Sequence, residues 1–363
     1  MKIDIVKLYS YELKLLRPIV VKGHQVLSRT GYVLELGAGP ARGYGEISPL
    51  EGFSSESMTS VRDQLGQLRH VLMADHMPDH LERLEGGFHD WLGNFSLLPS
   101  VAFGIEMAIL NLIAGGRDVT LTELLADTRH THIPINGLLQ GEPALLIEQA
   151  RQLVAEGFTA IKLKVGRSLE DDIRLVKGIS QAIDGHALLH LDANQAWSLD
   201  EAVYFGNEVG LAAVDYIEEP LASHPDIPEF FRRTTIPVAL DETLRVVSFN
   251  DVKKMEGVDV IVLKPSIIGG IEKTWDWVRD AKAQGINTLI SSIFKSSLGL
   301  LCLANLAGCS FRNNAAGLDT GKWFESDLLR EPLEIQRGKM EIGGRRMTAA
   351  DINFDLLTEV PLS

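Results

Sequence analysis

A repeated strand-and-helix pattern that begins after Pro134 constrains the fold more than any other feature of the sequence. Short runs of β-branched and apolar residues recur there, and segments with helical periodicity separate them. Regular alternation of this kind predicts right-handed crossovers and a parallel sheet. Repeats over about 190 residues favour a closed (β/α) barrel over an open doubly wound sheet. The predicted strands are 133–138, 160–165, 187–192, 214–218, 238–241, 258–264, 288–291 and 317–319.

The chain before these repeats predicts a separate α+β domain. Its start alternates apolar and polar residues between glycines, as an antiparallel meander does, and residues 56–127 have helical patterns with a start signal at Pro99. We therefore predict an α/β fold, a (β/α)7β-type TIM barrel at residues 131–325. An N-terminal α+β capping domain is predicted at residues 1–130, and the C-terminal tail, 326–363, is expected to pack back on it and complete it.

Composition narrows the range of partners. The formal net charge of -14 argues against nucleic acids and anionic membrane surfaces. The most apolar run, 298–306, is about half the length that spans a bilayer. The N-terminus has no apolar signal region, and Cys302 and Cys309 are too far apart along a helix to pair. We expect a cytoplasmic protein that acts on a small molecule; its oligomeric state is unknown from the sequence.

Charged residues stand at the ends of five successive predicted strands. They are Lys164, Asp192, Glu218 with its neighbour Glu219, Asp241 and Lys264. The carboxyl ends of barrel strands form the face on which barrel enzymes place their chemistry. We therefore expect these side chains to meet at one end of the barrel.

Three converging carboxylates would repel one another unless a cation joins them, and carboxylate oxygens suit Mg²⁺, or Mn²⁺, better than Zn²⁺. Lys162 and Lys164 lie two apart on a strand and share a face, so each ammonium group is expected to lower the pKa of the other. A lysine with a lowered pKa is a usable base near neutral pH. The pattern predicts a metal-assisted proton abstraction next to a carboxylate.

Each residue also has a simpler interpretation. The two lysines on one strand could guard a sheet edge, and Asp192 or Asp241 could cap the following helix. Lys264 could form a structural ion pair with Asp241. It is the occurrence of all five at the same end of consecutive strands that favours a site.

The same stretches resemble the muconate-lactonising branch of the enolase superfamily, at residues 161–164, 191–194, 217–220, 240–242 and 263–265. Further runs are similar to those of the o-succinylbenzoate synthases, at residues 43–50, 52–54, 99–104, 290–292, 296–300 and 317–320. The resemblance covers nearly the whole chain.

This resemblance implies a Mg²⁺-dependent lyase that forms 2-succinylbenzoate through an enediolate intermediate in menaquinone biosynthesis. It implies that Lys164 is the base, that Lys264 stabilises the enolate, and that Lys162 assists Lys164 and contacts the substrate carboxylate. Asp192, Glu218 and Asp241 would be the metal ligands; strand alternation alone leaves Glu218 and Glu219 open. Asn194, Ser291 and Gly317 match substrate-binding positions.

The segment 20–30 could be a simple surface hairpin or a lid over the site, and the resemblance favours a lid that includes His24 and Arg29. Gly269 and Gly270 open a helix that could bind an anion, but a tight turn is the simpler interpretation.

Two departures from the family pattern bear on the substrate. His190 stands where some relatives have arginine, and Asp319 is not followed two residues later by the second acid of dipeptide epimerases. The latter argues against a substrate with an amine. The alternatives are an N-succinylamino acid racemase, a muconate cycloisomerase and, from a different class, an inactive barrel that serves as a binding scaffold.

Overall fold

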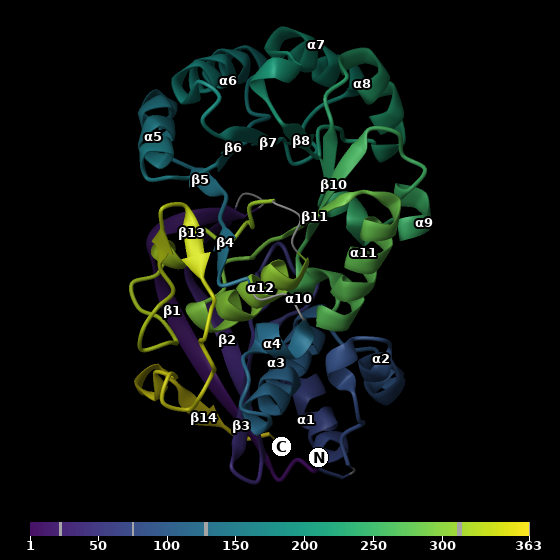
Figure 1. Ribbon diagram of the computed structural model, residues 1–363, viewed down its shortest axis with the longest axis vertical. Coiled ribbons are helices and arrows are strands. Elements are labelled where there is room, and N and C mark those ends of the chain that lie inside the picture. Colours follow the sequence, from purple (N-terminus) through teal and green to yellow (C-terminus); the bar gives the residue numbers. More distant parts are fainter. Residues whose placement is uncertain (22–23, 75, 127–129, 311–313, 363) are drawn as a thin grey trace.

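A computed structural model describes residues 1–21, 24–74, 76–126, 130–310 and 314–362. Figure 1 shows a curved row of strands with helices outside it, beside a capping domain built from a sheet and several helices. This arrangement confirms the predicted fold class, a barrel with an N-terminal α+β domain.

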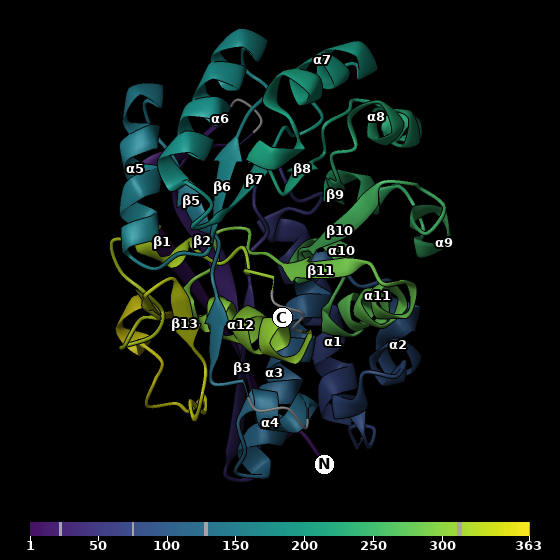
Figure 2. The same ribbon diagram turned by 45° about the horizontal axis from the view of Figure 1, so that its top comes forward.

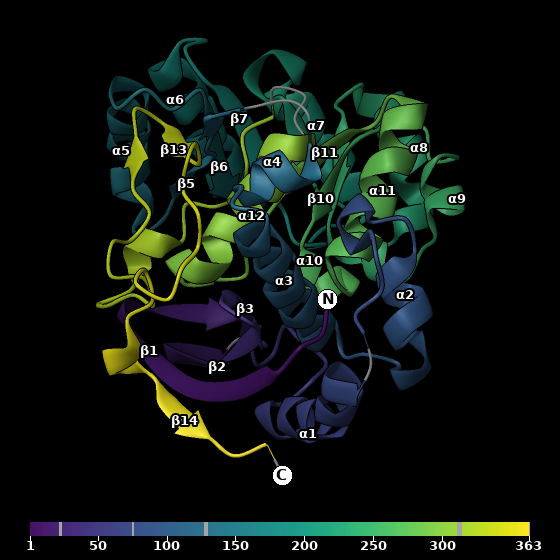
Figure 3. The same ribbon diagram turned by 60° about the horizontal axis from the view of Figure 1, so that its bottom comes forward.

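The capping sheet is antiparallel, with the strand order β14-β1-β2-β3. Its first three strands follow one another in the chain as the predicted meander, and the last comes from the C-terminal tail, where Leu8 of β1 pairs with Val360 (Figure 3). The tail therefore completes this sheet. The strands are β1 (Ile5–Val21), β2 (His24–Ala38), β3 (Ala41–Ile47) and β14 (Thr358–Val360).

The longest helix of the capping domain, α3, packs directly on β3. A side chain at Gly45 would place its Cβ 1.9 Å from the carbonyl oxygen of Gly104, so only glycine permits this approach. By length and composition α3 could cross a membrane, but its residues 100–114 are all buried inside the protein, which accounts for their apolar character. The helices here are α1 (Met58–Ala74), α2 (Gly87–Leu92), α3 (Pro99–Gly116) and α4 (Leu121–Leu125).

The barrel sheet is parallel and keeps the order of the sequence, from β5 to β11. Figure 2 shows helices α5 to α8 and α11 on the outside of this curved sheet. The strands are β5 (Gly137–Leu139), β6 (Ala160–Lys164), β7 (Leu188–Asp192), β8 (Tyr216–Glu218), β9 (Val238–Leu240), β10 (Val258–Leu263) and β11 (Asn287–Ile290). The helices are α5 (Pro143–Ala155), α6 (Leu169–Ile183), α7 (Leu199–Val209), α8 (Ile227–Thr234), α9 (Phe249–Val252), α10 (Pro265–Ile268), α11 (Ile271–Gln284) and α12 (Ser297–Ser310).

The ends of the barrel differ from the prediction. The strand predicted at 133–138 is split into β4 (His132–Pro134) and β5, and the one predicted at 317–319 is not a regular strand. Single parallel bridges, Ser291 with Gly317 and Ile135 with Ala316, join the two edges instead. These bridges close the ring as a (β/α)7β barrel.

The C-terminal tail contacts more than the capping sheet. Its hairpin of β12 (Ile335–Gln336) and β13 (Lys339–Glu341) pairs with β4, just before the first strand of the barrel sheet. The tail therefore connects the two parts of the protein. Short 3₁₀ turns lie at Leu81–Arg83, Gly93–Phe95, Leu211–Ala213, His224–Asp226, Glu242–Arg245, Gly321–Trp323 and Phe354–Leu356.

The turn at Gly269 and Gly270 is a structural feature rather than an anion site. Gly270 has a φ of 114° and precedes α11. The first backbone N–H groups of α11, those of Ile271 and Glu272, donate to the buried carboxylate of Glu106 on α3. A side chain of the capping domain thus caps this barrel helix.

Elsewhere in the barrel, the helix α12 is almost wholly buried, and its two cysteines are free, as expected.

Lys295 is a fully buried cation between the two parts of the protein. Its Nζ donates to Ser48 Oγ at 2.9 Å and lies 4.9 Å from the centroid of the Phe103 ring. Ser48 Oγ in turn donates to Glu46 at 2.9 Å. Burial lowers the pKa of Lys295 from 10.5 to about 8, although the charge of Glu46 opposes this shift.

We predict that the stability of Lys295→Met relative to the wild type is higher at pH 7 than at pH 10. Between pH 8 and 10.5 the unfolded chain holds a proton that the folded chain has lost, so stability rises with pH through this window. Below it the wild type carries a buried charge that Lys295→Met lacks, although the variant also loses the hydrogen bond to Ser48 and leaves Glu46 without this cation. Thermal unfolding at both pH values measures the difference; Lys177→Met, at a half-exposed surface ion pair, is the control. An equal difference between the variant and the wild type at both pH values would contradict the prediction.

Candidate active site

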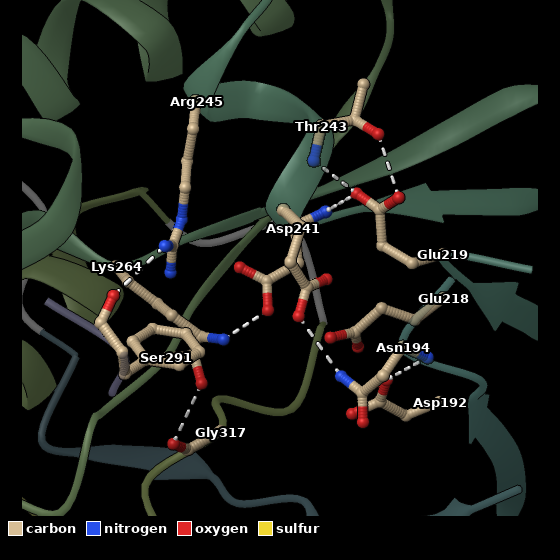
Figure 4. Close-up of polar contacts among 12 residues, drawn as sticks. Asp192, Asn194, Glu218, Glu219, Asp241, Thr243, Arg245, Lys264, Ser291 and Gly317 are labelled. Carbon is tan, nitrogen blue, oxygen red and sulfur yellow. Dashed lines mark hydrogen bonds and ion pairs between the residues drawn. The ribbon is translucent and has the colours of Figure 1, made fainter. Parts of the chain in front are cut away.

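Five charged residues meet at the carboxyl end of the barrel strands. Lys164, Asp192 and Glu218 are the last residues of β6, β7 and β8, while Asp241 and Lys264 directly follow β9 and β10. Lys164 pairs in register with Asp192, and Asp192 with Glu218. Figure 4 shows the carboxylates of Glu218 and Asp241 directed toward the same space. The alternation of strands and helices therefore brings together the residues that the sequence analysis singled out.

Lys162 lies one level below these strand ends and contacts two of the acids. Its Nζ is 2.9 Å from Asp192 Oδ2 and 2.7 Å from Glu218 Oε2. Burial acts to lower the pKa of Lys162, but the charges of the two carboxylates outweigh it and hold the pKa well above its usual value. Lys162 is therefore a fixed positive charge beneath the acids. Its predicted effect on the pKa of Lys164 stays a prediction.

The other two lysines flank the acids. Lys264 is ion-paired with Asp241, and this carboxylate holds the pKa of Lys264 above its usual value although burial opposes the shift. Lys164 is exposed and donates from Nζ to Asn194 Oδ1 at 3.2 Å. Because β6 and β10 stand on either side of the three strands that carry the acids, the lysines approach this space from opposite sides.

The structure distinguishes Glu218 from Glu219. Glu219 accepts the backbone N–H groups of Asp241 at 2.8 Å and Thr243 at 2.7 Å, and its second oxygen accepts from Thr243 Oγ1 and Gln195 Nε2. Glu219 is therefore fully used in holding the turn after β9. Glu218 Oε1, in contrast, is buried and has no hydrogen-bond partner.

The acids fit a hard divalent cation. Burial, and then the charge of Asp192, raises the pKa of Glu218 to about 8, although Lys162 opposes the shift. The negative charge of this carboxylate is therefore not fully compensated by the lysines around it. No three acid, histidine or cysteine side chains in the described ranges already form a ligand cluster. The carboxylates of Asp192, Glu218 and Asp241 instead contact Lys162 and Lys264. Oxygen donors of this kind suit Mg²⁺ or Mn²⁺.

The three predicted substrate-binding residues lie in two places. Asn194, which follows β7, has a left-handed backbone with φ 45°. Its side chain accepts from Lys164 at the end of β6 and donates to Glu242 Oε1, after β9, at 3.1 Å. Ser291 and Gly317 lie together where the ring closes, and a Cβ on Gly317 would come 2.6 Å from Ser291 Oγ. The glycine thus permits the close approach of Ser291 Oγ to the backbone at position 317.

The predicted lid segment is the end of the β1–β2 hairpin, which was one of the two alternatives. Val21 pairs with His24 at this end; residues 22–23 and the side chain of His24 lie outside what the structure describes. Arg29 is buried, and its guanidinium donates to the carbonyl oxygens of Ser48, Pro49 and Phe294. Arg29 therefore anchors the hairpin to the barrel rather than facing a substrate. That the hairpin end covers the site stays a prediction.

His190, the departure from the family pattern, is a buried part of the barrel interior. Its ring stacks on Tyr216 at 4.2 Å, and its nitrogens lie 2.9 Å from Asn136 Nδ2 and 3.1 Å from Asp215 Oδ2. Burial lowers the pKa of His190, although Asp215 opposes the shift. A neutral His190 thus packs inside the barrel beside Lys162, its in-register neighbour on β6.

The sequence analysis missed three residues at this site. Glu242 is half-buried beside the acids, and its Oε2 has no partner. Phe53 of the capping domain reaches the barrel mouth, where its ring contacts Lys264 and Arg245. Glu242 directly follows a predicted ligand, which is a usable signal. Nothing in the sequence pairs Phe53 with Arg245, since 192 residues separate them.

The comparisons with known proteins agree with this geometry. Residues 145–345 match the family model described as enolase C-terminal domain-like, and residues 3–112 match the MenC N-terminal domain. The solved N-succinyl Arg/Lys racemase from Bacillus cereus shares the fold with a TM-score of 0.84 at 20% identity, covering 99% of this chain and 100% of that one.

The chain therefore belongs to the enolase superfamily. Its curated relatives narrow this to the o-succinylbenzoate synthase family: the synthase of Aliivibrio salmonicida is 30% identical over 89% of this chain and 92% of its own. Protein PHYLLO of Arabidopsis thaliana, a chloroplastic protein, is 31% identical over 91% of this chain, which spans 22% of the length of that relative.

We predict that substitution of the two neighbouring glutamates changes thermal stability in different ways. We expect Mg²⁺ to raise the melting temperature of the wild type, and Glu218→Gln should abolish this rise, because it removes the charge of a buried carboxylate whose Oε1 has no partner. Glu219→Gln should lower the melting temperature without Mg²⁺, because it loses hydrogen bonds worth about 1–3 kcal/mol, and should still respond to Mg²⁺. Thermal unfolding with and without Mg²⁺ measures both. A retained Mg²⁺ response in Glu218→Gln would remove Glu218 as a ligand.

Proposed function

We propose that the protein is an o-succinylbenzoate synthase. It would dehydrate 2-succinyl-6-hydroxy-2,4-cyclohexadiene-1-carboxylate to 2-succinylbenzoate, a step of menaquinone biosynthesis. The observation that carries the proposal is the arrangement of a lysine, three acids and a second lysine on consecutive strand ends of this fold. The curated relatives over nearly the whole chain support the same reaction.

Lys164 acts as the base in this proposal. In its neutral form, its Nζ takes the proton from the ring carbon that bears the carboxylate. The electron pair of the broken C–H bond first moves into the substrate carboxylate, which gives the enediolate, and then forms a ring double bond as the bond to the hydroxyl group breaks. Lys164 returns its proton to the departing hydroxyl group, which leaves as water. The ring is then aromatic and Lys164 is again neutral. Asn194, which accepts from Lys164, orients the amine.

The remaining charged residues of the site stabilise the negative charge that develops on the substrate, directly or by holding the metal. Asp192, Glu218 and Asp241 would hold the Mg²⁺, which supplies a positive charge that stabilises the negative charge developing on the substrate carboxylate. Lys264 keeps its proton and adds positive charge from the other side. Lys162, paired with Asp192 and Glu218, keeps these ligands in place.

We predict that Lys164→Ala lowers the rate of dehydration by about 1,000-fold or more, because a positioned general base contributes on this scale. It should abolish exchange of the α proton in D₂O by the same step. Formation of the aromatic product, followed by its absorbance, measures the first effect, and NMR measures the second. Lys177→Ala, which removes a surface lysine of α6, is the matched control.

Exchange at the normal rate in Lys164→Ala would remove this residue as the base. Absence of dehydration in the wild type with Mg²⁺ would remove the synthase proposal itself.

The second candidate is an N-succinylamino acid racemase, which the placement of one lysine on each side of the site would also serve. An amine-bearing substrate, as in a dipeptide epimerase, is less compatible with the site. The carboxylate of Asp319 accepts from the Leu138 backbone N–H at 3.2 Å and from Lys322 at 2.5 Å, so a substrate amine would have to displace that ammonium group.

A further inference from the structure

Arg245 is a cation at the barrel mouth that has no acidic partner. It ends the 3₁₀ turn Glu242–Arg245, which directly follows the predicted ligand Asp241, and it is exposed. Across the described residues, no ion pair includes its guanidinium, whereas the surface arginines of three barrel helices pair with acids one turn away. In a chain with a net charge of -14, an unpaired arginine beside the acids of the site requires an explanation.

The capping domain fixes the position of Arg245. Its Nη1 donates to the carbonyl oxygen of Phe53 at 3.1 Å, and its Cζ lies 4.3 Å from the centroid of the Phe53 ring. The ring and the carbonyl thus use one face and one N–H group of the guanidinium. The other N–H groups have no partner among the described residues and are available to a ligand.

Phe53 also joins Arg245 to the catalytic end of the barrel. Lys264 Nζ lies 4.8 Å from the centroid of the same ring, so the two cationic groups are within about 9 Å of each other. Figure 4 shows Arg245 extending from the turn toward Lys264. A substrate that reaches Lys264 with one end can therefore reach Arg245 with the other.

We propose that Arg245 forms a subsite for a second carboxylate of the substrate, at the rim of the barrel. The inference rests on the proposed function, whose substrate carries a ring carboxylate and a succinyl chain that ends in another. The planar guanidinium offers two parallel N–H groups to a carboxylate, which an ammonium group does not. Arg245 thus selects dicarboxylates, while the metal and lysines act on the ring carboxylate.

A purely structural role for Arg245, in which it only holds Phe53, predicts a different result from the subsite. Loss of a structural contact would weaken the binding of every ligand alike. Loss of the subsite would weaken only ligands with the distal carboxylate. Two product analogues separate these roles: 2-succinylbenzoate, and 2-butanoylbenzoate, in which a methyl group replaces the distal carboxylate.

The test measures the affinity of both compounds by calorimetry with Mg²⁺. We expect the wild type to prefer 2-succinylbenzoate by about tenfold, the scale of a charge-assisted hydrogen-bond pair. Arg245→Met should lose most of this preference through weaker binding of 2-succinylbenzoate, and Arg245→Lys should lose part of it. Arg232→Met removes the same charge from the outer helix α8 and should behave as the wild type.

Equal weakening of both compounds in Arg245→Met, or no preference in the wild type, would overturn the subsite. Dehydration by the wild type separates this failure from that of the proposed function. If the wild type dehydrates the cyclohexadiene carboxylate and Arg245→Met keeps the preference, only the subsite is wrong. If the wild type does not dehydrate it, the proposed function fails and the subsite with it.

Discussion

Repulsion among three buried carboxylates is the constraint on which the site depends. Asp192, Glu218 and Asp241 are 3%, 1% and 5% exposed, so water screens them little. Lys162 and Lys264 offset this charge by direct contact, yet one oxygen of Glu218 keeps no partner. Three buried carboxylates that two lysines compensate only in part fit a hard divalent cation. The barrel brings these carboxylates together because its successive strands end on the same face.

The capping domain contributes more than a cover for the barrel. Glu106 caps a barrel helix, and Arg29 and Lys295 bury their charges where the two parts meet. Arg29 and Lys295 contact Ser48 and Pro49 in the loop that follows β3, and this loop carries Phe53 to Arg245 and Lys264. The chemistry is thus set by strand ends of the barrel, while the shape of the outer part of the site depends on contacts between the two parts of the protein.

The sequence predicted the features that depend on local pattern. Strand ends follow from alternation, so the positions of Lys164, Asp192 and Lys264 could be read from spacing. The choice between Glu218 and Glu219 could not, because it depends on backbone N–H groups more than twenty residues away. The burial of Arg29, the stacking of His190 and the contact of Phe53 with Arg245 could not be predicted either, because they depend on residues that are distant in the sequence. The closing strand was mispredicted because single bridges replace a regular ladder there.

The central claim is that this site removes the proton next to the ring carboxylate of the substrate and that the substrate then loses water. The most direct measurement is ¹H NMR of the wild type with Mg²⁺ in D₂O, with the cyclohexadiene carboxylate and an N-succinyl amino acid offered separately. We predict rapid appearance of aromatic 2-succinylbenzoate from the first and slow α-deuteration of the second. Fast deuteration and racemisation of the amino acid with slow aromatisation would contradict this account and make the racemase the main activity.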